Sequence, residues 1–451
     1  MAGDSESGAN TLSASPAAVP VPGAGRVEPL GPVFVSYRQS DGTELAADLA
    51  WALRAAGVPV WHDHTDLPPG DTSQRLAEAL SSGLSGAILV VTPDIAMSEV
   101  VRSIELPALL DLAQDPGFTF SIVSTVVRPD DSLDYSAPDE LLETPGGTLA
   151  AIEQLPVMTA VQRARVAQAQ ARRRLEHLQP AIAERGGRLI LDLQTRVPPH
   201  ASRFEADLIV RLRPPADGQR RPHRQALEDL RNFLGQLPQL VAIGGASRIE
   251  VHGGAHLSAA CAFGAALPTT LMGTVDVIDT RGSSWTTDGQ VARSSADPTV
   301  AVIDASIGNR DRSPVLAYID LVPSRSDGEF NDLVSTSSFA EAVHLRPVDD
   351  GLLEPDDAPC IVGDVVTIVR DLAGVHGTTE VHLLLRCPFP IALLIGRCLN
   401  TLTVHLYEWE DAPEPTSSTP RYVPAMILRS GAGGSPIDAV MAPPNIESEE
   451  P

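Results

Sequence analysis

The chain has 451 residues, too many for one ordinary domain, and 43% of them are hydrophobic, enough to bury two or three cores. Its formal net charge of −25 argues against sequence-independent binding to long nucleic acid, while a local basic pocket for a small anion is compatible with it. The acidic first residues lack the apolar stretch of a signal peptide, and the longest apolar runs are far shorter than a membrane span.

The cysteines form no CxxC pair and show no metal-ligand spacing with histidine; they are Cys261, Cys360, Cys387 and Cys398. We therefore expect free thiols in a reducing compartment, and no metal site. Together with the missing signal peptide and membrane span, this predicts a cytoplasmic protein.

The two ends differ in composition from the rest of the chain. Residues 1–29 are rich in Ala, Ser, Gly and Pro without periodicity, and residues 431–451 have the same texture. Such segments bury too little apolar surface to fold, so we predict a disordered leader and a disordered tail.

Residues 30–155 alternate predicted strands and helices. Buried strands are expected within GPVFVSYRQSDG, VPVWHD, GAILVVTP and FTFSIVSTVV. Helices are expected within ELAADLAWALRAAG, which ends at Gly57, and within TSQRLAEALSSGL. The alternation predicts an α/β region with a parallel sheet and right-handed crossovers, whose ligands bind at the carboxyl ends of the strands.

The stretch MSEVVRSIELPALL places one acid, Glu105, among apolar residues. In a helix, Val101, Glu105 and Leu109 share one face, where a carboxylate is costly to desolvate. One explanation is an ion pair with Arg102, three residues earlier. The other is that the carboxylate faces a cleft and takes part in chemistry there.

Residues 156–186 contain a long basic helix, TAVQRARVAQAQARRRLEHL, which we expect to connect two regions. Its arginines are interpreted as a solvated face, with a docking surface for an acidic neighbour as the alternative; they are Arg163, Arg165, Arg172, Arg173 and Arg174.

Residues 187–430 contain a weak internal repeat. Residues 247–279 and 378–408 each begin with an EVH strand, followed by a loop, an Ala/Leu-rich helix with one glycine (Gly264 or Gly396) and a second strand. Two similar βα halves predict a duplicated, Rossmann-like domain with a ligand site between the halves, although chance similarity of two βα units is the alternative.

The first region resembles a bacterial TIR domain over residues 31 to about 150. The resemblance lies in VFVSYRQSDG, in VWHDHTDLPPG and in SEVVRSIELP. It implies a flavodoxin-like fold, and NAD-cleaving TIR domains carry an essential glutamate in a Ser-x-x-Trp-x-x-x-Glu setting. Ser98, Val101 and Glu105 fit this spacing, with Val in place of Trp, so the resemblance implies that Glu105 is catalytic.

The second region resembles a SAVED domain, a sensor that looks like two fused CARF-like halves and binds cyclic oligonucleotides. The resemblance is carried by EVHLLLRCPFPIALLIGRCLNTLTVHLYEWE and by the companion stretch EVHGGAHLSAACAFGAAL. The order of the two regions is that of TIR–SAVED effectors of CBASS-type anti-phage defence.

Cleavage of the bond between nicotinamide and ribose develops positive charge on the ribose, which a buried carboxylate stabilises. Residues of the two loops at the strand ends are candidates to bind NAD, although Phe34 and Trp61 are equally good core residues; the set is Phe34, Ser36, Tyr37, Arg38, Trp61, Asp63, Asp66 and Leu67. In NAD-cleaving TIR domains the loop that corresponds to HDHTDLPPGD often completes a neighbouring subunit's site.

A cyclic oligonucleotide calls for backbone amides at helix N-termini, for cations and for flat side chains. The candidates after the strands of the second region are Arg386, Arg397, His256, Arg281, Trp285 and Trp409, with surface arginines and half-buried aromatics as the alternative. No resident cofactor is expected, because NAD would be the substrate and a cyclic oligonucleotide, with cyclic tri-adenylate as a candidate, the activator.

The sequence therefore predicts a NAD glycohydrolase that ligand binding activates by self-association through both domains. Two alternatives remain open: a TIR domain that cyclises ADP-ribose into a signal, and a non-catalytic TIR scaffold. Water and an internal nucleophile compete for the same intermediate, so the residues do not separate hydrolysis from cyclisation.

Overall fold

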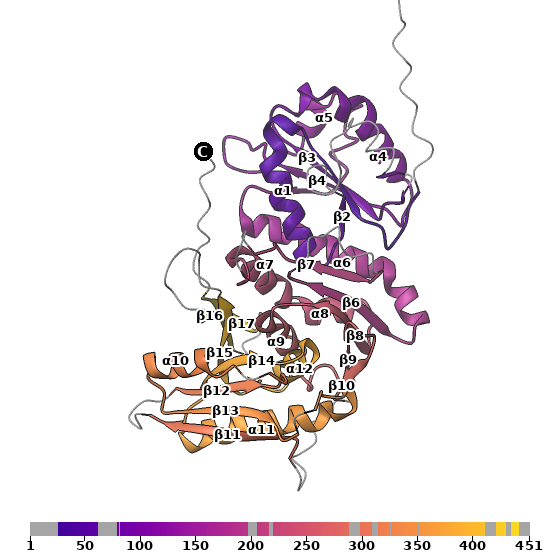
Figure 1. Cartoon of the computed structure of the whole chain (residues 1–451). Helices are drawn as coiled ribbons and strands as arrows, with labels where there is room; N and C mark the ends of the chain where they lie inside the picture. The colour runs from indigo at the N-terminus through magenta and orange to yellow at the C-terminus, as the bar shows by residue number, and fades with distance from the viewer. Residues whose placement is uncertain are drawn as a thin grey trace, which may run out of the picture.

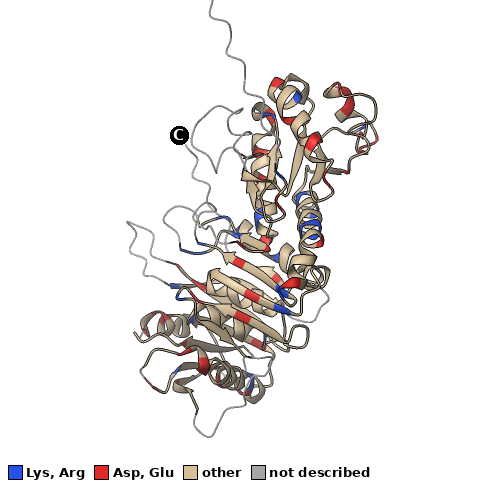
Figure 2. Cartoon of the chain, turned by 90° about the vertical axis from the view of Figure 1, so that its right-hand side faces the viewer, with Lys and Arg blue, Asp and Glu red and all other residues tan. Residues whose placement is uncertain are grey.

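A computed structural model describes residues 26–61, 79–80, 82–196, 205–215, 220–287, 298–308, 314–324, 326–349, 351–410, 421–429 and 434–441. Within these ranges the strands form three sheets of five, five and seven strands. Figure 1 shows the sheets following one another along the molecule, the first at the top and the third at the bottom. Figure 2 shows basic and acidic residues interspersed along the ribbon.

The first sheet is parallel throughout and has the strand order β2-β1-β3-β4-β5. Its strands are β1 (Val33–Ser36), β2 (Val60–Trp61), β3 (Gly86–Val91), β4 (Thr119–Ser124) and β5 (Gln154–Pro156). Its helices are α1 (Gln39–Ala55), α4 (Leu106–Leu112) and α5 (Ala137–Leu141), and a 3-10 turn spans Ile95–Met97. The order 2-1-3-4-5 confirms the flavodoxin-like fold. Every residue of β3 and β4 is buried, as expected of parallel strands covered on both faces.

Helix α6 (Ala160–Glu184) follows, and it begins with a capping box between Thr159 and Gln162. Four of its five arginines reach at least partly into solvent, but Arg174 is buried and corrects the expectation of a solvated face. Its guanidinium donates to the carbonyl of Asp207 (2.7 Å) on one side and to those of Leu30 and Gly31 (both 2.9 Å) on the other. Arg174 thus links the segment before β1 of the first sheet to the segment before Leu208 in the second.

The first and second sheets are also joined directly. The Ile209 amide donates to the Gly57 carbonyl at 2.8 Å. A single apolar cluster runs from Leu49 through Leu175 to Leu191, so one core crosses the boundaries at 155 and 186 that the sequence suggested. The first region is therefore packed on the second through α6.

The second sheet has the order β10-β9-β8-β6-β7. Its strands are β6 (Arg188–Gln194), β7 (Leu208–Arg211), β8 (Arg248–Gly254), β9 (Thr274–Ile278) and β10 (Ser284–Thr286). Its helices are α7 (Arg224–Leu234), α8 (Leu237–Ile243) and α9 (Leu257–Ala265).

The third sheet has the order β11-β13-β12-β14-β15-β16-β17. Its strands are β11 (Val300–Ile307), β12 (Val315–Asp320), β13 (Glu341–Pro347), β14 (Glu380–Arg386), β15 (Thr403–Glu410), β16 (Arg421–Arg429) and β17 (Ile437–Val440). Its helices are α10 (Gly328–Thr336), α11 (Ala358–Val375) and α12 (Phe389–Gly396), with a 3-10 turn over Pro355–Asp357.

The two halves repeat one plan. In each sheet four parallel strands lie in the same order, β7-β6-β8-β9 and β13-β12-β14-β15, followed by an antiparallel strand, β10 or β16. This confirms the duplicated Rossmann-like architecture.

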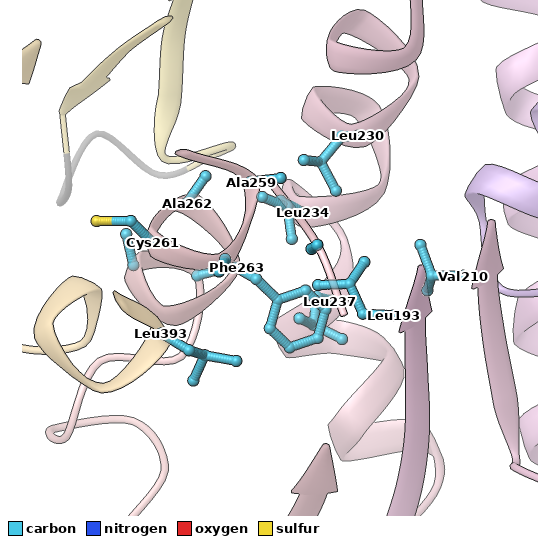
Figure 3. Close-up of a cluster of buried hydrophobic side chains, with 14 of the residues drawn as sticks. Leu193, Val210, Leu230, Leu234, Leu237, Ala259, Cys261, Ala262, Phe263 and Leu393 are labelled. Carbon is cyan, nitrogen blue, oxygen red and sulfur yellow. The ribbon is translucent and has the colours of Figure 1, made fainter. Parts of the chain in front are cut away.

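Helices α9 and α12 pack together between the second and third sheets (Figure 1), and their close approach explains why each carries a glycine at the contact. A Cβ on Gly264 would lie 1.9 Å from the Leu393 carbonyl oxygen, and one on Gly396 would lie 2.0 Å from that of Cys261. Figure 3 shows Phe263 of α9 pointing toward Leu193 and Leu237, close to Leu393 of α12.

The described residues at the inner edges of both predicted disordered ends, 26–29 and 434–441, are ordered, while residues 1–25 and 442–451 lie outside the described part of the chain. Within 1–29, the Glu28 amide donates to the Leu84 carbonyl at 2.9 Å. Within 431–451, residues 437–440 form β17, which pairs antiparallel with β16 because its apolar side chains cover the edge of the core. None of the helices in the described ranges combines the length and apolar character needed to cross a membrane.

Candidate functional site

Glu105 lies after β3, at the end of a π-helical turn, Val101–Glu105, that leads into α4. Irregular turns of this kind often occur at functional sites, because they redirect one side chain out of the regular helical face. Only 4% of the Glu105 surface is exposed. The hydroxyl of Ser36, at the carboxyl end of β1, donates to its Oε2 at 2.6 Å.

The surroundings of Glu105 bear on the ion-pair explanation. Arg102 is ion-paired with Glu99 at 2.9 Å and with Glu143 at 3.6 Å. Val101, in the position of the aromatic residue in the TIR pattern, is buried in the apolar cluster beneath α4. The structure thus brings the acid to the end of β1, while its neighbours serve packing and surface pairing.

The NAD-binding candidates of β1 divide between the two faces of the sheet. Phe34 pairs in register with Trp61, and both pack in the apolar cluster on the face that carries α4. Tyr37 belongs to the cluster on the opposite face, which carries α1 and α6. Arg38 is ion-paired with Asp41 at 3.1 Å and with Asp94 at 3.7 Å.

Of the expected set, Ser36 is hydrogen-bonded to Glu105. The remaining candidates, Asp63, Asp66 and Leu67, lie outside the described residues.

A second candidate site is a cavity of about 690 Å³ between the two halves of the duplicated region. Its lining comes from the segments that follow β6, β7, β8 and β12, from the end of β14 and the residue after it, and from the ends of β15 and β16: Arg196, Pro215, Arg220, His256, Leu257, Val322, Ser326, Leu385, Arg386, Cys387, Tyr407, Glu408, Trp409 and Tyr422. It holds three of the six predicted contact residues: His256, Arg386 and Trp409.

Arg386 is oriented by a buried carboxylate. Its guanidinium donates to Asp320 Oδ1 at 2.7 Å and to the Ser324 hydroxyl at 2.8 Å. Burial opposes charge on Asp320, but hydrogen bonds from His344, Arg386 and Arg346 outweigh it and hold the pKa of Asp320 below its usual value. The arginine is thus fixed at the cavity wall with a quarter of its side chain exposed.

His256 is buried and positions its neighbours. Its Nδ1 lies 2.7 Å from the Thr195 hydroxyl, and its Nε2 lies 2.7 Å from the Arg220 carbonyl. Burial lowers its pKa, against the opposing field of Glu408, so the neutral ring donates from Nε2 and accepts at Nδ1. It fixes the Arg220 loop at the cavity rim.

One carboxylate in the cavity wall, that of Glu408, already accepts a hydrogen bond from within the protein. Glu408 accepts the Ser258 amide at 2.8 Å, so it occupies part of the N-terminus of α9 that was expected to meet phosphate. Trp409 and Tyr422 lie edge to face, with ring centroids 5.4 Å apart.

Three predicted contacts lie elsewhere, since the described lining of the cavity does not include them. Arg397 is fully buried and donates to the carbonyls of Leu267 (2.9 Å) and Met272, so it links the two halves instead of meeting a ligand. Trp285 is buried in β10 with its indole N–H on Asp279 at 3.0 Å, and Arg281 lies exposed in the adjoining turn.

Sequence reasoning missed two of the arginines and two of the aromatic residues. Arg196 follows β6, so the rule that ligands meet the carboxyl ends of parallel strands would have found it. Arg220, Tyr407 and Tyr422 carried no such signal: Arg220 lies in a loop, and the two tyrosines read as core residues.

Comparison with known proteins identifies two different domains in the chain. The family model of the TIR domain matches residues 33–146. The model of the SMODS-associated and fused to various effectors sensor domain, SAVED, matches residues 233–428. No curated protein matches the chain.

Solved structures with similarity include SAVED/CARF-domain receptors named Cap4. The Acinetobacter baumannii receptor with the cyclic trinucleotide 2'3'3'-cAAA is 12% identical, covering 87% of this chain and 99% of its own, with a TM-score of 0.44. The Moraxella osloensis receptor is 13% identical, covering 86% and 98%, with a TM-score of 0.39. The two family models show that the chain contains an N-terminal TIR domain, over residues 33–146, and a C-terminal SAVED sensor domain, over residues 233–428.

Proposed function

We propose that this protein is a NAD-cleaving TIR effector that is switched on when a cyclic oligonucleotide binds its SAVED domain and drives self-association. Its role would be NAD depletion in CBASS-type anti-phage defence. The observation that carries the proposal is the buried carboxylate of Glu105, held by the Ser36 hydroxyl at the carboxyl end of a TIR strand.

In the proposed reaction the bond between ribose C1′ and the nicotinamide nitrogen breaks, and nicotinamide leaves with the bonding electron pair. Positive charge develops on the ribose, and Glu105 stabilises it. Water then attacks C1′ and loses a proton, giving ADP-ribose. In a site of low effective dielectric, one fixed carboxylate contributes several kcal/mol, or about a hundredfold or more in rate.

The cavity between the SAVED halves has the chemistry that a cyclic oligonucleotide needs. Arg196, Arg220 and Arg386 provide cations for phosphates, and Trp409 and Tyr422 provide flat faces for bases. Its volume of about 690 Å³ lies in the usual range for small-molecule sites, roughly 300–1,000 Å³. Because both halves contribute, a bound ligand would bridge them.

The catalytic proposal is tested by NAD loss in the presence of a panel of cyclic oligonucleotides, including cyclic tri-adenylate. Glu105→Gln keeps the size of the side chain but removes its charge, so we expect activated cleavage to fall by at least about a hundredfold. Glu99→Gln is the matched control, because Glu99 lies on the same segment and is three-quarters exposed.

Undiminished cleavage by the Glu105→Gln protein would contradict the assignment. A wild-type protein inert toward NAD with every ligand that it binds would favour the non-catalytic scaffold. The mass of the product separates hydrolysis from cyclisation, because cyclic ADP-ribose lacks the added water.

A further inference from the structure

Two neighbouring strands of the second SAVED half bring three side chains with metal-binding atoms to one face of the sheet. Glu380 and His382 are two residues apart on β14 and therefore point the same way. His382 pairs in register with His405 on β15, so the two imidazoles lie side by side. Glu380, His382 and His405 each offer one ligand atom, a carboxylate oxygen or a ring nitrogen. These three atoms all lie within 4.8 Å of one another.

The Glu380 carboxylate lies close to both histidines. Glu380 Oε1 lies 3.2 Å from His405 Nε2 and 3.8 Å from His382 Nε2. Two ligand atoms about 2.0–2.2 Å from a tetrahedral zinc ion are themselves about 3.4 Å apart, close to these separations. The imidazole rings are stacked, with centroids 4.3 Å apart and planes 14° apart, so one ring must rotate out of the stack for both nitrogens to bind a single ion.

The contacts around His382 favour binding through Nε2. Its Nδ1 lies 2.7 Å from the Tyr407 hydroxyl, and Phe339 packs edge-on against the ring at 5.1 Å. A histidine that binds a metal through one nitrogen commonly donates the other N–H to a polar group, which fixes the ring.

We propose that Glu380, His382 and His405 form a binding site for a first-row divalent cation, with Zn²⁺ as the best fit and an open coordination position toward solvent. Two imidazoles and one carboxylate are a common open zinc set. The Glu380 side chain is 44% exposed and that of His405 21%, so the ion has a path in. The site is independent of the proposed NAD cleavage.

Two other clusters of acidic and histidine side chains are poorer candidates for a metal site. Asp320, Asp327 and His344 also lie within reach of one another, but Asp320 is already paired with Arg346 and Arg386, two cations that would repel a metal.

The equivalent strand of the first half, β8, carries Glu250 and His252, whose side chains meet at 2.6 Å. Continuing the register in which Val251 pairs with Val277 puts Ile278, not a histidine, beside His252. His252 in the first half is therefore a natural control position for substitutions of the histidines in the second half.

The test is titration of the metal-free full-length protein with Co²⁺, read by the visible absorption of the bound ion, with Zn²⁺ as competitor. We expect the wild-type protein to bind Co²⁺ with a tetrahedral or five-coordinate spectrum. His405→Gln and Glu380→Gln should weaken this binding by more than about a hundredfold, because loss of a group that merely orients a ligand already costs about 10–100-fold. His252→Gln should bind as the wild type does.

Circular dichroism and the melting temperature without metal establish that each variant is folded, and the exposed Glu380 provides a second variant if His405→Gln fails this check. Absence of a Co²⁺ spectrum in the wild type would leave a hydrogen-bonded Glu–His pair and overturn the proposal. Equal binding by the wild type and both folded variants would place the metal elsewhere in the chain and overturn it too.

Discussion

Arg196 and Arg281 are two exposed arginines of the SAVED domain that differ in whether they line the cavity. Arg196 lines the cavity after β6, whereas Arg281 lies in an exposed turn outside its described lining. Both side chains are exposed, so substituting either arginine removes no buried group. This makes them a matched pair for locating the ligand.

We predict that Arg196→Gln weakens binding of the activating cyclic oligonucleotide by about 1.5–3 kcal/mol, the net contribution of a hydrogen bond to a charged group. Arg281→Gln should leave the affinity unchanged. Direct titration of both variants measures this. The reverse pattern, with Arg281 affecting affinity and Arg196 not, would move the site from the cavity to the β9–β10 turn.

His256 makes the cavity sensitive to acid. Its pKa is lowered in the folded protein by burial, while the unfolded chain takes up a proton near the ordinary value, about 6.5. The unfolded state therefore binds more protons below that pH, so the stability that neutral His256 contributes is present above about pH 6.5 and is lost as the pH falls toward its folded value.

We predict that the free energy of unfolding decreases below about pH 6.5, where the unfolded chain takes up the proton. The ligand affinity should decrease only at the lower pH at which folded His256 is itself protonated, because a proton on Nδ1 removes the acceptor of the Thr195 hydroxyl. His256→Gln should flatten these parts of the two pH profiles. Chemical denaturation and ligand titration from pH 5 to 8 provide the measurement, and an unchanged slope in the variant would assign the effect to another group.

At the scale of elements, the contact between α9 and α12 depends on two glycines. A Cβ on Gly264 would overlap the Leu393 carbonyl, and backbone cannot move aside as a flexible side chain does. Gly374 of α11 also lies in a helix, but a Cβ there would meet nothing within 4 Å. The two positions separate close packing from helix propensity.

We predict that Gly264→Ala destabilises the protein by about 1–3 kcal/mol or more, the usual cost of overpacking. Gly374→Ala should be neutral or stabilising by up to about 1 kcal/mol, because alanine is the better helix former. Thermal unfolding of both variants tests this, and equal effects would mean that the helices separate without cost.

The fold was predictable from the sequence where patterns are local. Strand–helix alternation predicted both the parallel TIR sheet and the two βα halves, because buried parallel strands read as continuous apolar runs. Glu105 was predictable because a carboxylate among apolar residues is costly and so stands out.

What the sequence left out depends on contacts between distant segments. Arg397 looks like a ligand contact in its helix, yet it is buried against carbonyls 125–130 residues away. Arg174 looks like one more solvated cation, yet it joins two domains. The Glu380, His382 and His405 trio arises only from the register of two strands. No spacing along the chain encodes such contacts.

At the scale of the whole molecule, the TIR domain is fixed to the SAVED domain. Arg174 joins the carbonyls of both, and one apolar core runs through α6. Buried contacts of this kind do not allow the TIR domain to move freely within one chain. We infer that ligand acts by bringing chains together, since a SAVED contact between chains then carries each TIR domain to a fixed position beside another.

We predict a largely monomeric resting protein that assembles when the ligand is added. The sequence HDHTDLPPGD, with two prolines and a glycine, is typical of a projecting loop, and Asp66 and Leu67 lie in it. If this loop completes a neighbour's cleft, specific NAD cleavage rises steeply with protein concentration at saturating ligand. Substituting Asp66 or Leu67 then lowers activity and leaves ligand affinity intact.

Mixing the loop variant with Glu105→Gln tests the shared site directly. We expect each variant alone to have low activity, but some junctions in the mixture combine an intact loop with an intact acid, so part of the activity should return. A head-to-tail contact repeats into rings or open filaments, and light scattering distinguishes either from a monomer. Ligand-saturated protein that stays monomeric and fully active would exclude the shared site, while the NADase assignment would still rest on the Glu105→Gln result.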